Sequence, residues 1–255
     1  MSAGKSPYQG KPEAQWANVT RQLLARHPLK PETILDVATA AWQDLWHTTV
    51  GAGRAKLPLV ELSIPSTVVG YFFEVIFAKE LESRFRGQWR GHRAKDDKDL
   101  VYLPDVTLSV EIKTSGQTGF KVYGNRSYGQ ELQNQLSGKK QKSGYYITMN
   151  FVGTTMTLLR FGWIDAEDWA PQVSPTGQMA GLSNAVYTHK LVVIPGDYRK
   201  DAPVRLLQGV GPRAVSEFDS RGIRTIRELL AFNGPLPPKL ERIRTATILE
   251  YEPTR

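Results

Sequence analysis

The 255-residue sequence predicts an α/β protein that ends in a small all-helical domain. Apolar residues recur at helical spacing through residues 12–85, and strand-like patterns follow between residues 103 and 194. The composition shifts near Pro195, which indicates a domain boundary. A chain of this length can bury one large core and carry a small second domain.

Three helices are expected before residue 90. The first begins near Pro12 and the second near Pro31, since proline suits the first turn of a helix. The third covers residues 66–85 and is apolar on nearly every side. Glu74 in its middle therefore needs a cation, a proton or hydrogen bonds, and a structural salt bridge would satisfy it as well as a functional site.

The segment 103–113 places two carboxylates and an ammonium group in a β-prone run. Apolar and polar residues alternate in its second half, as in a half-buried strand, so Glu111 and Lys113 lie side by side on one face. Such a pair is often only a solvated salt bridge. Asp105 precedes Glu111 by about 20 Å along a straight strand. The chain must therefore turn within residues 106–109 for the two carboxylates to meet.

Further secondary structure is expected after the segment 103–113. Strands are expected over residues 145–152, 156–164 and 191–194, a helix over 130–142, and an exposed loop over 171–186.

Composition narrows the class of protein. Lys and Arg outnumber Asp and Glu 33 to 25, and the resulting net charge of +8 and pI near 9.6 favour a polyanionic partner such as nucleic acid. The lack of cysteine excludes disulfides, thiolate metal sites and cysteine nucleophiles. Four scattered histidines predict no histidine metal cluster. With no signal peptide and no long apolar run, the sequence predicts a soluble, cytoplasmic protein without membrane contact.

Pro104, Asp105, Glu111 and Lys113 together resemble the catalytic motif of the PD-(D/E)xK nuclease superfamily, which includes most type II restriction endonucleases. The resemblance implies a central mixed sheet flanked by helices, and hydrolysis of DNA with Mg²⁺ as the cofactor. Asp105 and Glu111 would bind the metal together with the backbone carbonyl of Ile112. Lys113 would orient or activate the attacking water.

Two further acidic residues enter through the same resemblance. A helix before the catalytic strands commonly supplies an extra acidic residue in this superfamily, and Glu74 has that place. Asp99 is the reserve ligand if Asp105 points elsewhere. The segments 139–151 and 161–165 resemble, more narrowly, the ScaI-like restriction endonucleases.

Candidate DNA-binding residues lie in the polar loop after the catalytic strand and in the basic run behind it. Arg, Asn and Gln suit base edges and Lys suits phosphates, although the same residues can form a solvated loop and helix face. The candidates are Lys121, Tyr123, Asn125, Arg126, Gln130, Lys139, Lys140 and Lys142.

Residues 206–230 resemble the helix-hairpin-helix family. Gly209 and Gly211 allow a tight turn, and Pro212 suits the start of the next helix. The resemblance implies that this hairpin, with Arg213 beside it, binds DNA phosphates without reading sequence. Such modules also serve in protein–protein contacts, and that alternative stays open.

These patterns predict a nuclease domain over residues 1–198 and a helix-hairpin-helix DNA-binding domain over residues 199–255. The predicted function is sequence-specific cleavage of double-stranded DNA by a type II restriction endonuclease. A homodimer is expected, because two-fold symmetry suits a palindromic site cut on both strands. Two alternatives remain: a repair or recombination nuclease or nickase of the same superfamily, and a non-catalytic DNA-binding protein with a vestigial nuclease fold.

Overall fold

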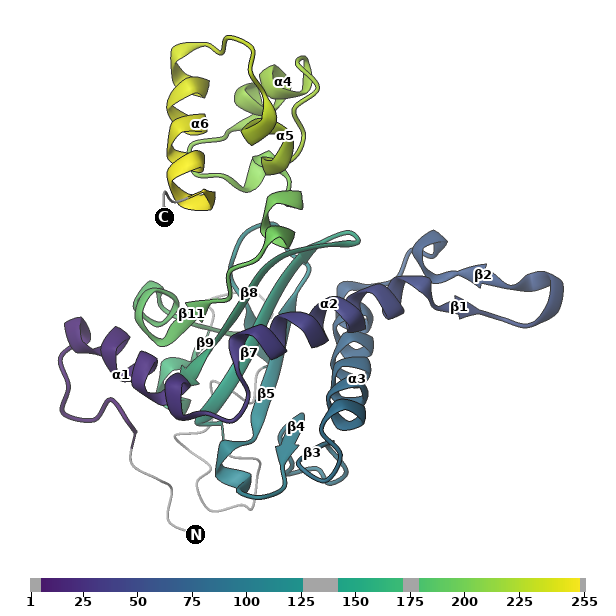
Figure 1. Cartoon of the computed structure of the whole chain (residues 1–255), viewed down its shortest axis with the longest axis vertical. Coiled ribbons are helices and arrows are strands. Elements are labelled where there is room, and N and C mark those ends of the chain that lie inside the picture. Colours follow the sequence, from purple (N-terminus) through teal and green to yellow (C-terminus); the bar gives the residue numbers. More distant parts are fainter. Residues whose placement is uncertain (1–5, 126–141, 172–178, 253–255) are drawn as a thin grey trace. The chain divides into compact units, whose positions relative to one another are not determined.

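The computed structural model describes residues 6–125, 142–171 and 179–252. The chain divides into two compact units (Figure 1). The first unit contains the residues up to 150 and residues 158–194, and the second contains residues 151–157 and 195–255. No helix within the described ranges is both long and apolar enough to span a membrane.

A six-stranded sheet forms the centre of the first unit. In spatial order its strands are β11 (Leu191–Val193), β8 (Thr155–Ile164), β7 (Gly144–Val152), β5 (Val110–Ser115), β4 (Leu100–Tyr102) and β3 (Trp89–Gly91). β5 and β7 are parallel, whereas β4 runs antiparallel to both β3 and β5. The sheet is therefore mixed, and the predicted fold class and the three later strands are confirmed.

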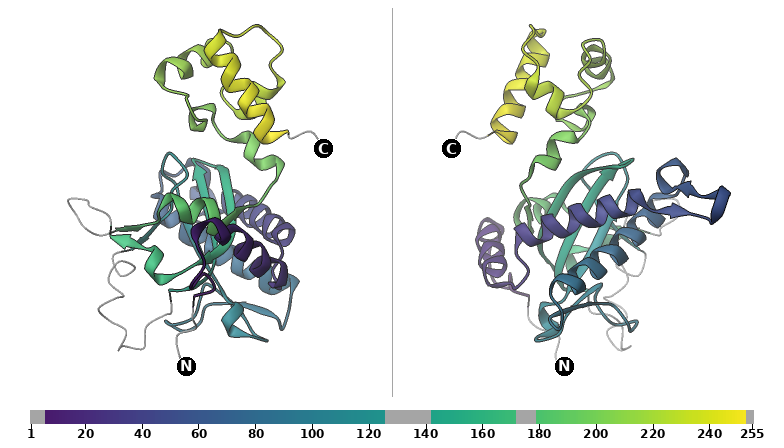
Figure 2. Two further views of the ribbon diagram at one scale, coloured as in Figure 1. Left: turned by 90° about the vertical axis from the view of Figure 1, so that its left-hand side faces the viewer. Right: turned by 45° about the vertical axis from the view of Figure 1, so that its right-hand side comes forward.

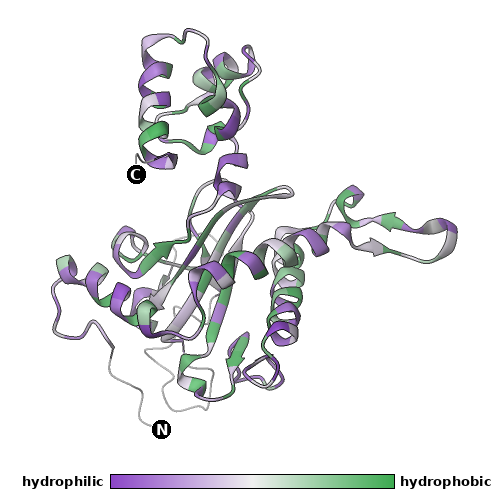
Figure 3. Ribbon diagram, viewed as in Figure 1, coloured by the Kyte–Doolittle hydropathy of each residue, from purple (hydrophilic) through white to green (hydrophobic). Residues whose placement is uncertain are grey.

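The three predicted helices are also confirmed as α1 (Glu13–Arg26), α2 (Pro31–His47) and α3 (Ser66–Arg84) (Figures 1 and 2). α2 and α3 pack together through Trp42 and Phe73, whose ring centroids are 5.9 Å apart. α3 is hydrophobic in its first half and hydrophilic in its last turns (Figure 3).

A glycine lets α3 approach the central strand closely. A Cβ atom at Gly70 would lie 2.1 Å from the hydroxyl of Thr114 on β5, so only glycine fits this contact. Residues four apart share one face of a helix, which places Glu74 and Ala78 in line with Gly70. Ala78 in turn lies against Gly91 on β3. Glu74 therefore lies on the face of α3 that packs against the sheet.

The turn predicted between Asp105 and Glu111 is a 3₁₀ turn, Val106–Leu108. The strand that follows begins at Val110, two residues later than the alternating pattern suggested. His27 supports this turn, since its Nε2 lies 2.9 Å from the Leu108 carbonyl oxygen.

The described residues of the first unit also form two smaller sheets. One contains β6 (Tyr123–Asn125), β10 (Met179–Gly181) and β9 (Ala170–Pro171). Ala180 of β10 and Val122, which directly precedes β6, share a core cluster with Tyr146 of β7. The other is a hairpin of β1 (Thr49–Val50) and β2 (Leu57–Pro58) that extends beyond α2 (Figure 2). The prediction of a loop over residues 171–186 is wrong at β10, which forms through pairing with distant strands.

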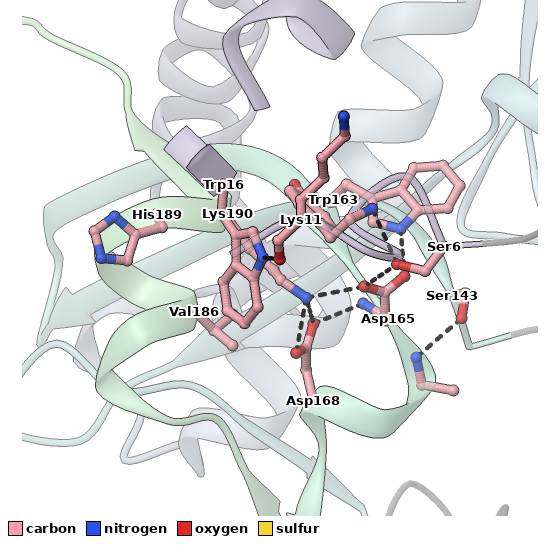
Figure 4. A network of polar contacts seen from close by, with 12 residues as sticks. Ser6, Lys11, Trp16, Ser143, Trp163, Asp165, Asp168, Val186, His189 and Lys190 are labelled. Carbon is pink, nitrogen blue, oxygen red and sulfur yellow. Dashed lines mark hydrogen bonds and ion pairs between the residues drawn. The ribbon is translucent and has the colours of Figure 1, made fainter. Parts of the chain in front are cut away.

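A buried ion network links residue Ser6 to the residues around Lys190 at the edge of the sheet (Figure 4). The ammonium group of Lys190 lies 2.9 Å from Asp165 and 2.8 Å from Asp168. Asp165 also accepts hydrogen bonds from the Ser6 hydroxyl at 2.8 Å and the Trp163 indole at 2.9 Å. The rings of Tyr8 and Trp16 lie beside the same ammonium group.

The second unit is helical, with α4 (Pro212–Asp219), α5 (Ile226–Ala231) and α6 (Pro238–Tyr251). Helix α4 begins at Pro212 as predicted, and a capping box of Thr225 and Glu228 starts α5. A single 3₁₀ turn, Val204–Leu206, precedes the glycine hairpin. The unit has its own core, made of Val204, Ala214, Phe218, Ile223, Leu229, Leu240 and Ile243.

Candidate functional site

Glu111 and Lys113 form a buried pair on β5. The ammonium nitrogen of Lys113 lies 2.7 Å from Glu111 Oε1, and the Glu111 side chain is only 3% exposed. Alternation along the strand puts the two side chains on one face, as predicted. A buried carboxylate of this kind requires a partner, and Lys113 supplies it.

Asp99 lies at the same place in the fold, just before β4. Its Oδ2 accepts a hydrogen bond from the backbone N–H of Ile112 at 2.7 Å, and the Ile112 carbonyl oxygen accepts one from Lys113 at 3.1 Å. The N–H and C=O of one strand residue point toward the same neighbouring edge. Asp99 and the Lys113 ammonium group therefore meet at one edge of β5.

That edge is left open by the short pairing of β4. Leu100 pairs with Val110, and within the described ranges no further residue of β4 pairs with β5. The Asp99 side chain takes the hydrogen-bonding position that a longer β4 would fill. Polar groups of Asp99, Ile112 and Lys113 thus gather where backbone pairing ends.

Glu74 reaches this group from α3. One ligand atom each of Glu74, His92 and Asp99 lies within 4.8 Å of the other two, a spacing that can hold a metal ion. His92 Nδ1 is 3.7 Å from Glu74 Oε1. The close contact of α3 with β5 and β3 delivers Glu74 to this position.

Burial and charge act in opposite directions on Lys113. Burial lowers the pKa of its ammonium group, but the nearby carboxylates of Glu111 and Asp99 outweigh burial and raise that pKa above its ordinary value. The pair is therefore held as an ammonium–carboxylate contact.

Asp105 has a different role in this structure. It is exposed, and its Oδ1 accepts hydrogen bonds from the Thr107 backbone N–H at 3.0 Å and the Thr107 hydroxyl at 2.7 Å. These bonds lower the pKa of the Asp105 carboxyl and cap the 3₁₀ turn. The residue group at metal-binding distance contains Asp99 but neither Asp105 nor Glu111. The assignment of Asp105 as a ligand stays a prediction.

Several predicted DNA-binding residues lie around β6. Lys121 and Asn125 are exposed, and Tyr123 is half-buried. Lys142 is half-buried just before β7. Four other candidates lie outside the described residues: Arg126, Gln130, Lys139 and Lys140.

The glycine hairpin of the second unit has the expected local geometry. Gly209 has φ of +82°, a conformation that favours glycine, and Gly211 caps α4 in an extended conformation. Gly209 and Arg213 are exposed, and Gly211 is half-buried.

Sequence reasoning missed His92 and kept Asp99 only in reserve. The signal for Asp99 was its position before a short β-prone run, Leu100–Tyr102, that pairs with β5. No comparable local signal marked His92, because its contact with Glu74 depends on how α3 packs.

Comparisons with known proteins identify the family of this chain. Residues 6–195 match the family model of the ScaI restriction endonuclease. The type II restriction enzyme ScaI of Streptomyces caespitosus is 35% identical over 199 residues, which cover 74% of this chain and 84% of that protein. A solved restriction endonuclease in complex with substrate DNA aligns with a TM-score of 0.40 and 12% identity, covering 79% of this chain and 97% of that one.

Proposed function

The chain belongs to the ScaI restriction endonuclease family, and on this basis we propose that it cleaves double-stranded DNA at a specific sequence with Mg²⁺ as the cofactor. The observation that supports this most directly is the group of Asp99, Glu111 and Lys113 at the open edge of β5. Carboxylates beside a lysine provide for metal binding and for charge stabilisation during phosphodiester hydrolysis.

The donor atoms fit a hard divalent cation. Carboxylate and carbonyl oxygens are the ligands that Mg²⁺ prefers. Asp99, with Glu74 and His92 at metal-binding distance, would hold it. Glu111 and the Ile112 carbonyl, which both contact Lys113, would be further ligands. A bound Mg²⁺ would polarise the scissile phosphate and make a bound water more acidic.

The chain's own residues have separate roles in this proposal. Lys113 orients the attacking water and stabilises the negative charge that develops on the phosphate oxygens. Glu111 holds the Lys113 ammonium group in place through the 2.7 Å contact. The Ile112 N–H fixes the Asp99 carboxylate, so its orientation does not depend on a flexible rotamer.

Plasmid cleavage tests the proposal against its alternatives. Incubation with Mg²⁺ is expected to yield discrete fragments, and sequencing their ends identifies the cleaved site. Nicked circles would instead indicate a strand nickase, and a gel shift without cleavage would indicate a DNA-binding protein only. Chelation with EDTA should stop cleavage, and added Mg²⁺ should restore it.

We also propose that the enzyme is a homodimer, since two-fold symmetry brings one site to each strand of a palindrome. Four apolar residues at helical spacing are exposed on the outer face of α3: Val68, Tyr71, Phe72 and Val75. This face suits contact with a second copy, and the same helix carries Glu74. Light scattering should give about twice the chain mass of 28.6 kDa. Phe72→Lys should give monomers, whereas Ser83→Lys on the same helix should not; a wild-type monomer would refute the proposal.

The second unit is proposed to add affinity without adding specificity. The hairpin around Gly209 and Gly211 presents backbone amides, and Arg213 lies beside it. Deleting residues 200–255 should weaken binding to all DNA sequences alike and leave the cleaved sequence unchanged. A folded truncated protein that cuts new sites would show that this unit reads bases.

A further inference from the structure

Among the polar side chains buried in the large sheet, Arg160 contacts both Thr148 and Asn150 beside β5. Thr148 and Asn150 on β7 have no solvent exposure, and Arg160 on β8 is 4% exposed. Thr148 is the register partner of Lys113 in the parallel β5–β7 pair, and Asn150 is the partner of Ser115. Because directly paired residues share a face of the sheet, these side chains continue the face that carries Lys113.

Arg160 connects this polar row to the segment before β6. Its Nη2 donates to the Phe120 carbonyl oxygen at 2.6 Å, while Nη1 contacts Asn150 Oδ1 at 3.3 Å and Thr148 Oγ1 at 3.4 Å. The rigid fork of a guanidinium group thus joins two strands to one backbone position. A buried guanidinium is costly compared with an apolar side chain of similar size, so stability alone does not explain it.

Two more side chains hold the next two residues. Asn150 Nδ2 donates to the Lys121 carbonyl oxygen at 3.0 Å. The Tyr187 hydroxyl accepts from the Val122 N–H at 2.9 Å and donates to the Val122 carbonyl oxygen at 3.2 Å. Burial raises the pKa of Tyr187, so the phenol stays neutral and can both donate and accept.

Three consecutive backbone positions, 120 to 122, are therefore each held by a different side chain. The held segment runs directly into β6, which carries Tyr123 and Asn125, two of the residues that the sequence predicts to contact DNA. A strand that begins from a fixed segment presents its side chains in a fixed position. Thr148, which contacts Arg160, is also the register partner of Lys113.

We propose that Arg160, Asn150 and Tyr187 are positioning residues for sequence recognition. They hold segment 120–122 so that Tyr123 and Asn125 contact base edges at a fixed position relative to β5. This inference rests on the proposed function and deepens it. The positioning residues do not touch DNA; they act through the backbone that leads to β6.

Tyr187→Phe provides the sharpest test, since it removes both hydrogen bonds to Val122 and keeps the packed ring. Affinity for the cognate site, identified by sequencing the cut ends, is measured against a one-base variant at one salt concentration. We expect the ratio of the two affinities to fall about tenfold, with nonspecific affinity unchanged. Arg160→Lys, which keeps the charge and loses the fork, should lower the same ratio.

Tyr8→Phe is the matched control, because Tyr8 is another buried tyrosine of the same unit, with its hydroxyl 2.9 Å from that of Thr20. Its affinity ratio should stay at the wild-type value. An unchanged ratio in folded Tyr187→Phe would overturn the inference, as would an equal fall in Tyr8→Phe. If wild-type protein shows no preference for any site, the proposed function fails instead.

Discussion

Lys113 and Lys190 are both buried lysines whose ammonium groups contact carboxylates, yet their surroundings differ. The carboxylates around Lys190 also accept bonds from Ser6, Trp163 and the Asp165 backbone N–H (Figure 4). Lys113 contacts Glu111 and the Ile112 carbonyl at a strand edge where β4 stops pairing.

We expect this difference to separate a structural ion pair, at Lys190, from the proposed catalytic pair at Lys113. Around Lys190, Asp165 and Asp168 form a capping box of one short turn, and aromatic rings cover the ammonium group. Around Lys113, carboxylates come from separate elements, since Glu111 lies on β5, Asp99 precedes β4 and Glu74 comes from α3. Carboxylates gathered from separate elements at an open edge suit a metal ion better than an ion pair enclosed by the fold.

The largest effect is expected at Lys113. Lys113→Ala should lower the cleavage rate by about 10²- to 10⁴-fold, because the charge beside the reacting phosphate is lost. DNA binding should remain largely intact, and Glu111→Ala should also stop cleavage. Single-turnover cleavage and gel-shift titration measure the two properties. Cleavage by Lys113→Ala near the wild-type rate would contradict the assignment.

Lys190→Met should have the opposite profile. Removing the ammonium group leaves two buried carboxylates without their cation, which should lower the free energy of unfolding by about 3–5 kcal/mol. Denaturant unfolding measures this loss, and the folded fraction should still cleave DNA. Loss of cleavage at unchanged stability would mean that Lys190 is not the structural member of the comparison.

Asp99 and Asp105 form the next pair to compare. Asp99→Asn should weaken Mg²⁺-supported cleavage, raising the metal concentration required by at least about tenfold, because a carboxylate next to the metal position is lost. Asp105→Asn should require nearly the same Mg²⁺ concentration as the wild type, since its carboxylate caps the turn at Thr107. Metal titrations of both variants decide the matter, and the reverse pattern would restore Asp105 as the ligand.

The smallest effect concerns His27, a buried titratable group held by backbone atoms. Burial lowers the pKa of His27 below its ordinary value. Its contacts with the Leu108 and Leu29 backbone raise that pKa, but by less than burial lowers it, and Lys30 lowers it slightly further. The ring centroid of Tyr145 lies 4.2 Å from that of the His27 imidazole. The folded state therefore favours neutral imidazole, while the unfolded chain takes up a proton as the pH falls below about 6.5.

The contribution of His27 to the free energy of unfolding should thus be fully present above about pH 6.5. It should decline as the pH falls toward the folded-state pKa, by at most about 1.4 kcal/mol per pH unit. Unfolding experiments at pH 7.5 and pH 5.5 on the wild type and on His27→Gln measure this contribution. The variant should lose less stability between the two pH values. Equal losses in both proteins would assign the pH dependence to other groups.

Local sequence was enough to predict the three N-terminal helices and the Glu111–Lys113 pair. Proline starts, helical periodicity and strand alternation act over a few residues, so they can be recognised without knowledge of distant contacts. The need for a turn after Asp105 also followed from strand length alone, and a 3₁₀ turn lies there. Helix α4 and the capping box of α5 were predictable for the same local reason.

Tertiary structure alone decided which acidic residues meet. Asp99 joins the site because β4 pairs with β5 for a single residue pair and leaves the Ile112 N–H to its side chain. Glu74 and His92 meet because Gly70 lets α3 lie against Thr114. The pairing of β6 with β10 likewise joins segments more than 50 residues apart. Such contacts depend on the packing of whole elements, and no local residue pattern encodes that packing.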